Sequence, residues 1–302
     1  MVFFENEPMS KHTSFKVGGN ARYLYKVESV EEILEVQNQL AGKKIPLFVV
    51  GNGTNLLVSD KGYYGGIIML GKSFSEVQEL GNGKFKVGAG LSLGAFARKT
   101  IKLGYCGIHK LAGVPGTLGG AIYMNAGAYG QEISQTCIEV ESLDPNGSIC
   151  IRKAEECNFS YRHSGFQNAA EIILSATFQL EGSETSGKDS YTLESEMQEC
   201  MAKRKASQPL NMPNAGSTFK RLDVGAEGMP QQIAPGYYIE QAGLKGYRIG
   251  GAEVSTVHAN FIVNADRATA ADIKNLSEHV QKAVAEKFGI QLQREIILLG
   301  DF

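Results

Sequence analysis

Three stretches of the chain have the apolar spacing or the composition of a helix. Residues 29–40 (SVEEILEVQNQL) repeat apolar residues at helical spacing, and Ser29 with Glu32 matches a capping box, in which each side chain bonds the other's backbone N–H. A second helix is predicted over about 192–205. The longest predicted helix covers 270–288, where apolar residues form one continuous stripe.

Short apolar runs bounded by turn residues predict strands. Residues 46–50 (PLFVV) form such a run, which predicts a buried strand that leads into the glycine-rich residues 51–55. The turn at 144–147 (DPNG) predicts a hairpin with residues 148–152. Further strands are predicted at 66–70, 84–87, 138–143, 172–180 and 291–299, with alternation of apolar and polar residues in 84–87, 138–143 and 172–180.

The predicted secondary structure and the glycine content of the sequence change after residue 180. Residues 182–189 (GSETSGKD) are polar and lack apolar periodicity, which predicts a linker. The part before it is rich in strands and glycine, and the part after it is richer in helix. With 302 residues, the chain is long enough for two or three domains.

Composition and charge narrow the possible functions. The formal net charge is −2, with 30 Lys and Arg against 32 Asp and Glu, so the chain lacks the basic footprint of a nucleic-acid-binding protein. No apolar run approaches the roughly 18 residues of a membrane span, and the N-terminus has neither the basic start nor the long apolar region of a signal peptide. We therefore expect a cytoplasmic protein that does not bind membranes.

The five cysteines do not suggest disulfides or a metal site. They are odd in number, scattered, and form no metal-ligand spacing. We expect reduced thiols and no bound metal.

Two glycine-rich segments each follow a predicted strand. Residues 51–57 (GNGTNLL) could direct backbone N–H groups at a diphosphate, although a segment of this kind is often an ordinary turn. Residues 88–94 (GAGLSLG) open a predicted helix that runs to Lys102 and superficially resemble a Rossmann fingerprint. The acidic residue that should follow a second strand is missing, which favours a simple packing turn.

A third glycine-rich segment, residues 112–130, has the strongest signal. Six of its nineteen residues are glycine and four are alanine, so its backbone can lie flat against a large planar ligand. It has too few charges for a solvent loop and too many apolar residues for disorder. We interpret it as a ligand cradle.

Three further residues could carry chemistry. Arg162 stands among aromatic residues and could bind a carboxylate or phosphate, or it could merely pack on Tyr161 at the surface. Ser217 follows Gly216 without the GxSxG pattern of an esterase, so its hydroxyl could instead donate a proton. Glu295 interrupts an apolar run; burial would raise its pKa and suit it as an acid, whereas an outward-facing Glu295 would have no such role.

Taken together and in this order, these segments resemble the MurB family of UDP-N-acetylenolpyruvoylglucosamine reductases. The resemblance runs from residue 12 (HTSFKVGG) to the C-terminus through GNGTNLLVSD, GVPGTLGGAIYMNAGAYG, YRHSGF, SQPLNMPNAGSTFKR, GLKGYRIGGAEVSTVHANFIVN and LQREIILLG. There is no room for the extra tyrosine-bearing loop of the longer family type, so the chain resembles the shorter, second type.

The resemblance implies a fold and a division into domains. It implies an α+β chain with the FAD-binding fold of the vanillyl-alcohol-oxidase type in two lobes, residues 1–70 and 71–183. A C-terminal α/β substrate-binding domain would follow at 184–302, with the final strand returning Glu295 to the active site.

The resemblance also implies an activity: NADPH-dependent reduction of UDP-N-acetylglucosamine enolpyruvate to UDP-N-acetylmuramate through FAD, in peptidoglycan synthesis. We expect a monomer, although the sequence does not determine the oligomeric state. The resemblance makes Arg162 the residue that polarises the substrate, Ser217 the proton donor and Glu295 the second acid. It places the FAD diphosphate at 51–55 and the flavin along 112–127. The implied cofactor-binding residues are Gly51, Asn52, Gly53, Thr54, Asn55, Gly113, Val114, Pro115, Gly116, Thr117, Gly119, Gly120, Ala121, Asn125 and Gly127. The implied substrate-binding residues are Tyr161, Lys205, Asn214, Lys220, His258 and Asn260.

The chain departs from the family pattern in three places. His109 and Lys110 replace an acidic and an apolar residue before the glycine run, and Gln293-Arg294 replaces Glu-Pro before the final glutamate. Residues 225–236 look like an insertion. None of these departures falls on a proposed catalytic residue.

Two other functions remain possible from the sequence. A non-catalytic sugar-nucleotide-binding protein of this fold should lack the acid or arginine positions, yet all three are present. A flavin oxidase of this fold often attaches its flavin through His or Cys, and neither occurs in 51–57 or 112–130.

Overall fold

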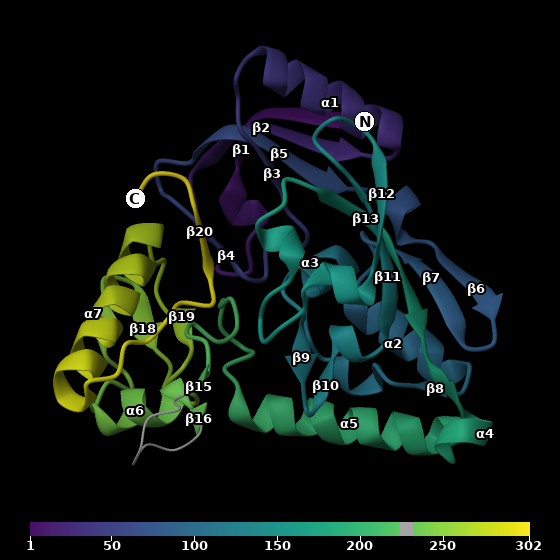
Figure 1. Ribbon diagram of the computed structural model, residues 1–302. Coiled ribbons are helices and arrows are strands. Elements are labelled where there is room, and N and C mark those ends of the chain that lie inside the picture. Colours follow the sequence, from purple (N-terminus) through teal and green to yellow (C-terminus); the bar gives the residue numbers. More distant parts are fainter. Residues whose placement is uncertain (224–231) are drawn as a thin grey trace. The chain divides into compact units, whose positions relative to one another are not determined.

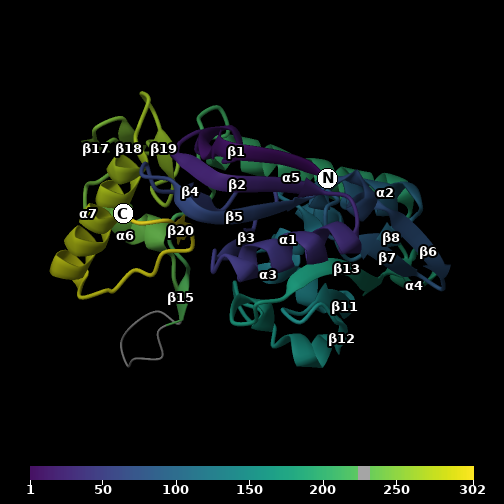
Figure 2. The same cartoon turned by 90° about the horizontal axis from the view of Figure 1, so that it is seen from above.

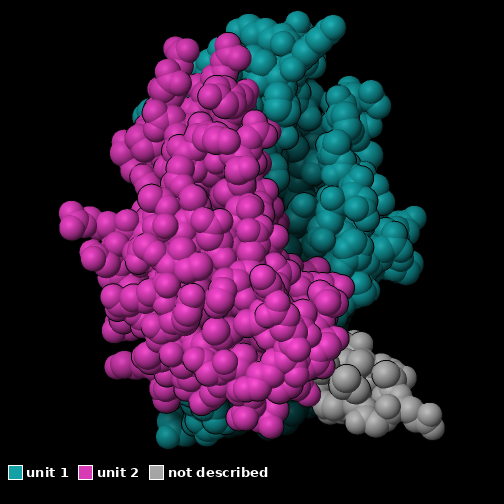
Figure 3. Space-filling model, turned by 90° about the vertical axis from the view of Figure 1, so that its left-hand side faces the viewer, with its two compact units in different colours: residues 1–4, 23–52, 65–204 teal, residues 5–22, 53–64, 205–302 magenta. Residues whose placement is uncertain are grey.

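The computed structural model describes residues 1–223 and 232–302, which form two compact units. Unit 1 consists of residues 1–4, 23–52 and 65–204, and unit 2 of residues 5–22, 53–64 and 205–302; Figure 3 colours them teal and magenta. The strands β1 (Val2–Pro8), β2 (Asn20–Val27) and β5 (Tyr63–Leu70) each run from one unit into the other. The sequence predicted a different kind of division, into two lobes and a C-terminal domain with boundaries at residues 70 and 183. The two compact units do not test that division, which stays a prediction.

Unit 1 is built around a five-stranded antiparallel sheet in the order β12-β11-β13-β7-β6 (Figure 1). Its strands are β6 (Val77–Gly81), β7 (Lys84–Gly88), β11 (Cys137–Leu143), β12 (Ile149–Lys153) and β13 (Ile172–Gln179). The predicted hairpin is confirmed, because Leu143 pairs with Ile149 and Asp144 N–H donates to Ser148 O at 2.9 Å.

The central strand β13 is buried over seven of its eight residues, so the alternation predicted there does not produce an exposed face. One side of it, including Phe178, packs with α2 (Leu93–Lys102), whereas Leu174 packs with α1 (Val30–Gly42). A strand covered on both sides has no need of polar residues on one face.

The remaining elements of unit 1 are short or helical. They are β3 (Leu47–Val49), β8 (Tyr105–Cys106), β9 (Gly127–Ala128), β10 (Gln131–Glu132), β14 (Glu181–Gly182), α3 (Leu118–Tyr123), α4 (Ser183–Ser186), α5 (Ser190–Ser207, whose last turn belongs to unit 2) and the 3₁₀ helices η2 (Lys72–Ser75), η3 (His109–Leu111), η4 (Ile133–Gln135), η5 (Ala154–Cys157) and η6 (Gly165–Gln167). The α1 and α5 helices confirm the two predicted in this part of the chain, and α2 confirms the helix to Lys102 (Figure 2).

Only half of the capping box predicted for α1 forms. The Ser29 hydroxyl accepts a hydrogen bond from Glu32 N–H at 3.3 Å. The Glu32 carboxylate turns away from Ser29 and accepts from Glu28 N–H at 2.7 Å and from the N-terminal ammonium. The nearby positive charge offers this carboxylate a better partner than the Ser29 N–H.

Two local predictions for unit 1 are wrong. The strand β3 is not a buried strand, because it lies at the edge of the sheet β1-β2-β5-β3 and Val49 is 37% exposed. The predicted linker at 182–189 instead continues as β14 and α4 into α5. Its polar residues face water from ordered structure, a pattern that composition alone cannot distinguish from a linker.

Unit 2 packs helix α7 (Ala270–Phe288) against the three-stranded sheet β17-β18-β19 (Figure 1). The α7 helix has the predicted bounds, and the Thr269 hydroxyl caps it by accepting from Asp272 N–H at 3.0 Å. The other elements are η1 (Met9–Lys11), β4 (Leu56–Val58), β15 (Leu222–Asp223), β16 (Gln232–Ile233), α6 (Pro235–Gln241), β17 (Arg248–Ile249), β18 (Ala252–Val254), β19 (Ile262–Asn264) and β20 (Ile297–Leu299). The insertion-like segment 225–236 lies largely outside the described residues.

The final strand is shorter than predicted. Only Ile297–Leu299 forms a strand, β20, which pairs in parallel with β4. The preceding residues are bonded instead to the segment after Ser217, and this contact sets the geometry of the candidate site. No helix in the part of the chain that the structure describes is long and apolar enough to span a bilayer.

Candidate active site

The first and third glycine-rich segments meet in unit 1. A Cβ on Gly51 would lie only 2.3 Å from Thr117 Oγ1, so a side chain at Gly51 would displace Thr117. Thr117 is itself the N-cap of α3, and its hydroxyl accepts from Gly120 N–H at 3.3 Å. The two segments predicted to bind one cofactor therefore lie side by side at this point.

From Gly53 onward, the first segment belongs to unit 2. Gly53 has a left-handed backbone (φ +59°), and a Cβ there would lie 2.0 Å from His12 O. Asn55 Nδ2 donates to Glu295 O at 3.0 Å, and Asn55 O accepts from Ile297 N–H at 2.9 Å. Asn55, predicted at the diphosphate, thus also fixes the backbone of a predicted catalytic residue.

Two glycines of the third segment, Gly113 and Gly120, test whether a flavin would fit. Neither Gly113 nor Gly120 has a left-handed backbone, and a Cβ would find its nearest neighbour at 3.4 Å and 3.6 Å respectively, which is ordinary contact. Packing within the protein therefore requires glycine at neither position. Gly120 is exposed inside α3, where glycine costs about 1 kcal/mol relative to alanine. The place of a Cβ on Gly113 is lined by Arg204 and Met201 of α5, whereas the bare backbone at Gly120 fits a planar ring that lies against it.

Asn125 connects this segment to the Arg162 loop. Its side chain is 1% exposed and donates to Ser160 O at 3.0 Å and Glu132 Oε2 at 3.2 Å, while its Oδ1 accepts from Ser134 N–H at 3.0 Å. The side-chain amide is thus occupied within unit 1. Its predicted contact with the cofactor stays a prediction.

Arg162 stands at the tip of a two-residue turn, between Ser160 and His163, whose N–H and C=O groups bond each other at 3.1 Å in both directions. Its backbone is left-handed (φ +53°), an uncommon conformation for a residue with a side chain, and such strain is concentrated at functional sites. Its guanidinium donates to Gly127 O at 2.9 Å and lies 4.9 Å from the centre of the Tyr161 ring. The contact with Tyr161 exists, as the surface interpretation expected, but Arg162 also contacts the glycine-rich segment.

The segment that follows Ser217 pairs with the segment that carries Glu295 within unit 2. Glu295 N–H donates to Thr218 O at 2.8 Å, and Lys220 N–H donates to Gln293 O at 2.8 Å, so the two segments run alongside each other. Glu295 is half-buried. Its position therefore lies between the two that the sequence left open, a buried acid and an outward-facing side chain. The sequence could not show this pairing, because the two segments are far apart in the chain.

The predicted substrate-binding residues are distributed over both units. Tyr161 is 38% exposed in unit 1, and Lys205 is exposed in the last turn of α5. Asn214 shapes the turn before Ser217: its Oδ1 accepts from Gly216 N–H at 2.9 Å, and its Nδ2 donates to Met212 O at 2.8 Å.

The last two predicted substrate residues lie side by side before β19. His258 is half-buried, and burial lowers its pKa below the ordinary value. Its Nδ1 accepts from Asn260 N–H at 3.1 Å, so the ring is held by backbone. Asn260 is 6% exposed, and its amide bonds to the backbone of Phe219. Contacts of either residue with substrate stay predictions.

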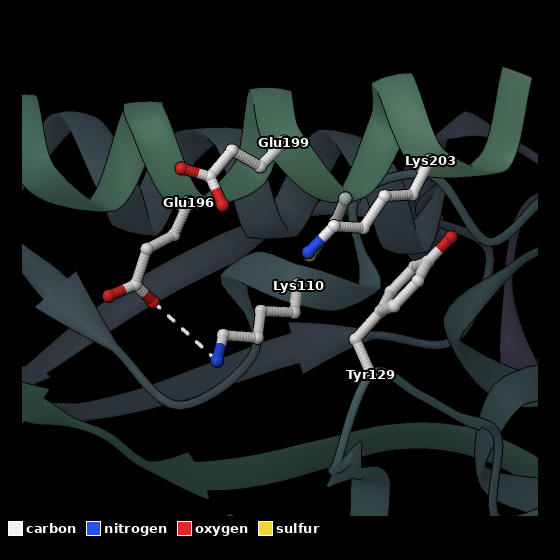
Figure 4. Close-up of a pocket in the computed structure, with 6 residues that line it drawn as sticks. Lys110, Tyr129, Glu196, Glu199 and Lys203 are labelled. Atoms are coloured by element: carbon white, nitrogen blue, oxygen red, sulfur yellow. Dashed lines mark ion pairs between the residues drawn. The ribbon is translucent and has the colours of Figure 1, made fainter. Parts of the chain in front are cut away.

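Sequence reasoning missed a pocket of about 570 Å³ in unit 1 beneath α5 (Figure 4). It is lined by Lys110, Tyr129, Glu196, Glu199, Cys200 and Lys203, none of which was predicted for catalysis or binding. Glu196 reaches from α5 to Lys110 at 3.7 Å. The departure of Lys110 from the family pattern was the only signal in the sequence. Among residues 1–223 and 232–302, no three His, Cys, Asp or Glu side chains are grouped as metal ligands.

Comparison with known proteins defines the class. Residues 21–151 match the protein-family model described as "FAD binding domain", and residues 208–299 match "UDP-N-acetylenolpyruvoylglucosamine reductase, C-terminal domain". The chain is therefore a flavin-dependent oxidoreductase with the FAD-binding fold of the vanillyl-alcohol-oxidase type and an additional C-terminal domain.

Individual relatives define the family. The chain is 44% identical to the UDP-N-acetylenolpyruvoylglucosamine reductase of Caldanaerobacter subterraneus subsp. tengcongensis, over 98% of the chain and 93% of that protein. It is 40% identical to that of Heliobacterium modesticaldum, over 99% of the chain and 91% of that protein. The crystal structure of the reductase from Thermus caldophilus is similar with a TM-score of 0.82, 31% identity and 98% coverage of both chains. The chain belongs to the UDP-N-acetylenolpyruvoylglucosamine reductase family.

Proposed function

We propose that this protein reduces UDP-N-acetylglucosamine enolpyruvate to UDP-N-acetylmuramate in the cytoplasm, with FAD as its cofactor and NADPH as the hydride donor. Membership of the reductase family supports the reaction class. The pairing of the Ser217 and Glu295 segments, with Glu295 N–H bonded to Thr218 O at 2.8 Å, is the single observation that carries it. It brings the sequence neighbourhoods of a proton donor and a second acid together. The product is a precursor of peptidoglycan, so the reaction serves cell-wall synthesis, cell shape and division.

FAD would supply the hydride chemistry, accepting a hydride from NADPH and passing it to the terminal vinyl carbon of the enol ether, a step that no amino-acid side chain can perform. The residues of the chain have other tasks. The backbone of 112–127, bare at Gly120, would hold the ring, and residues 51–55 would bind the diphosphate.

Arg162 would stabilise the negative charge that develops on the substrate carboxylate. Its guanidinium offers several donors in one plane, and its Gly127 bond at 2.9 Å together with the Tyr161 ring holds that plane in place. A donor fixed before the reaction loses little free energy to reorganisation when the charge appears.

Ser217 would donate the proton that the alpha carbon requires. Gly216 before it has a left-handed backbone (φ +78°), and its N–H is bonded to Asn214, so the approach to Ser217 is fixed. Glu295, in its protonated form, would bind the substrate carboxylate and help to stabilise the negative charge that develops on it.

The test measures product formation by wild type and by Ser217→Ala. We expect wild type to consume NADPH only when the enolpyruvyl sugar nucleotide is present and to form a sugar nucleotide with two added hydrogens, identified by mass spectrometry. Ser217→Ala should be about 10²- to 10⁴-fold slower, since this is the usual contribution of one positioned acid. Ser195→Ala, at an exposed serine of α5, is the control. Full activity in Ser217→Ala would contradict the assignment of the proton donor.

A further inference from the structure

The backbone after Ser217 is held from two sides within unit 2. On one side, the pairing with residues 293–295 fixes Thr218 and Lys220. On the other side, Thr218 N–H donates to Asn260 O at 2.7 Å, and the Thr218 hydroxyl accepts from Ile262 N–H at 3.2 Å. The segment is therefore a strand-like element that is hydrogen-bonded along both edges.

The Asn260 side chain makes the most specific of these contacts. Its Oδ1 accepts from Phe219 N–H at 3.1 Å, and its Nδ2 donates to Phe219 O at 2.9 Å. One amide thus satisfies both backbone groups of one residue, as a neighbouring strand would do. Both groups are buried, and an unsatisfied buried backbone group costs about 1–3 kcal/mol.

The loop that carries Asn260 is also fixed. Asn260 N–H donates to His258 Nδ1 at 3.1 Å, and the Ser255 hydroxyl accepts from Val257 N–H at 3.1 Å. Phe261 N–H donates back to His258 O at 3.0 Å. A side chain mounted on a rigid loop can transmit its own position to the segment that it binds.

We propose that Asn260 is a positioning residue that sets the place of the Ser217 hydroxyl through the Phe219 backbone, rather than a ligand of the substrate. Its carbonyl oxygen and one N–H of its amide are occupied by Phe219, and the residue is 6% exposed, which leaves little of it to meet a substrate. Asn260 and Phe219 are 41 residues apart in the sequence, so this contact depends on the folded chain. The inference rests on the proposed role of Ser217.

The experiment measures the two half-reactions separately by stopped-flow absorbance of the flavin, in H₂O and in D₂O. We expect Asn260→Ala to be reduced by NADPH at nearly the wild-type rate. Its reoxidation by UDP-N-acetylglucosamine enolpyruvate should be about 10- to 100-fold slower, since a catalytic group displaced by about 1 Å loses on this order. The solvent isotope effect on reoxidation should increase, because proton transfer becomes the slow step.

Asn264→Ala is the matched control. Asn264 is half-buried, and like Asn260 it uses both ends of its amide on backbone: Nδ2 donates to Phe15 O at 3.0 Å, and Oδ1 accepts from Ala268 N–H at 2.8 Å. It makes no such bond to residues 217–219. It should lose comparable thermal stability without a larger isotope effect. If Asn260→Ala does not fold, Asn260→Asp keeps the shape and the acceptor but removes the amide donor to Phe219 O.

The outcomes separate this inference from the proposed function. An unchanged reoxidation rate in the Asn260 variants, or an identical effect in Asn264→Ala, would overturn the positioning role while wild type still turns over. Equal slowing of both half-reactions would also overturn it, since Asn260 would then matter for general structure. If the enolpyruvyl sugar nucleotide fails to reoxidise reduced wild type, the proposed function itself fails.

Discussion

At the scale of single residues, glycines that look alike in the sequence are present for different structural reasons. Gly51 and Gly53 are required by the chain itself, because a Cβ would collide with Thr117 and His12. Gly120 is not required in this way, since a Cβ would meet only Thr117 Oγ1 at 3.6 Å. The sequence predicted all of them as cofactor residues, but it could not separate packing from ligand contact, which depends on neighbours distant in the chain.

Gly120→Ala should therefore have opposite effects on the two forms of the protein. We expect the form without FAD to become more stable by up to about 1 kcal/mol, because alanine favours the helix. Affinity for FAD should fall, because the new methyl group occupies the space of the ring. The measurements are thermal unfolding of the apoprotein and titration of FAD by fluorescence quenching.

Gly42→Ala provides the control for this prediction. Gly42 ends α1 and is exposed, and a Cβ on it would have no other atom within 4 Å. The substitution should stabilise the protein without any change in FAD affinity. If Gly120→Ala binds FAD as tightly as Gly42→Ala does, α3 does not face the flavin.

At the scale of elements, helix α5 is fixed to η3, directly before the glycine-rich segment, by a charged network. Glu196 on α5 accepts from Lys188 at 2.5 Å and from His109 Nε2 at 2.9 Å. His109 Nδ1 accepts from Gly107 N–H at 3.4 Å, which assigns the proton to Nε2. Burial lowers the pKa of His109, so the ring is held neutral. His109, a departure from the family pattern in sequence, thus helps to hold η3 directly before the glycine-rich segment.

Glu196→Gln should destabilise the protein at neutral pH but less in acid. The bonds to Lys188 and His109 lower the pKa of Glu196 from 4.5 to about 2, so its stabilising effect is complete above pH 4.5 and declines as the pH falls toward 2. We expect a Tm lower than that of wild type by about 2–4 °C at pH 7. The difference should shrink steadily between pH 4.5 and pH 3.

Thermal unfolding followed by circular dichroism at pH 7 and at pH 3 measures this difference in Tm. Glu194→Gln, an exposed glutamate on the same helix, should change Tm little at either pH. A Tm deficit in Glu196→Gln that stayed constant down to pH 3 would show that the carboxylate charge does not contribute.

Elements with a strong local pattern were predicted well, and those decided by distant contacts were not. The bounds of α7 follow from its apolar stripe and its cap. Residues 291–296 have an apolar pattern as well. Residues 293–295 within them nevertheless bond with residues 218–220 instead of extending β20, because the Ser217 segment provides the partner. That choice depends on tertiary structure, which no window of sequence contains.

At the scale of the whole molecule, the order of motifs identified the family, but the path of the chain was not predictable. The linker predicted at 182–189 is ordered. The chain passes from one compact unit to the other within β1, β2, β5 and α5, and also between Asn52 and Gly53. The predicted catalytic residues are divided accordingly, with Arg162 in unit 1 and Ser217 and Glu295 in unit 2. The order of motifs along the sequence does not depend on which unit each motif joins, so it could identify the family. A change in composition shows only that a segment is polar, so it could not locate the boundary between the units.

The central claim is that the reduced enzyme passes its electrons to an enol ether rather than to oxygen. The most direct measurement reduces the purified holoenzyme anaerobically with NADPH, removes excess nicotinamide, and adds UDP-N-acetylglucosamine enolpyruvate while the flavin absorbance is followed. The account predicts prompt recovery of the oxidised spectrum with formation of UDP-N-acetylmuramate. No recovery with this substrate, but prompt recovery on admission of oxygen, would contradict the reductase assignment and favour an oxidase of the same fold.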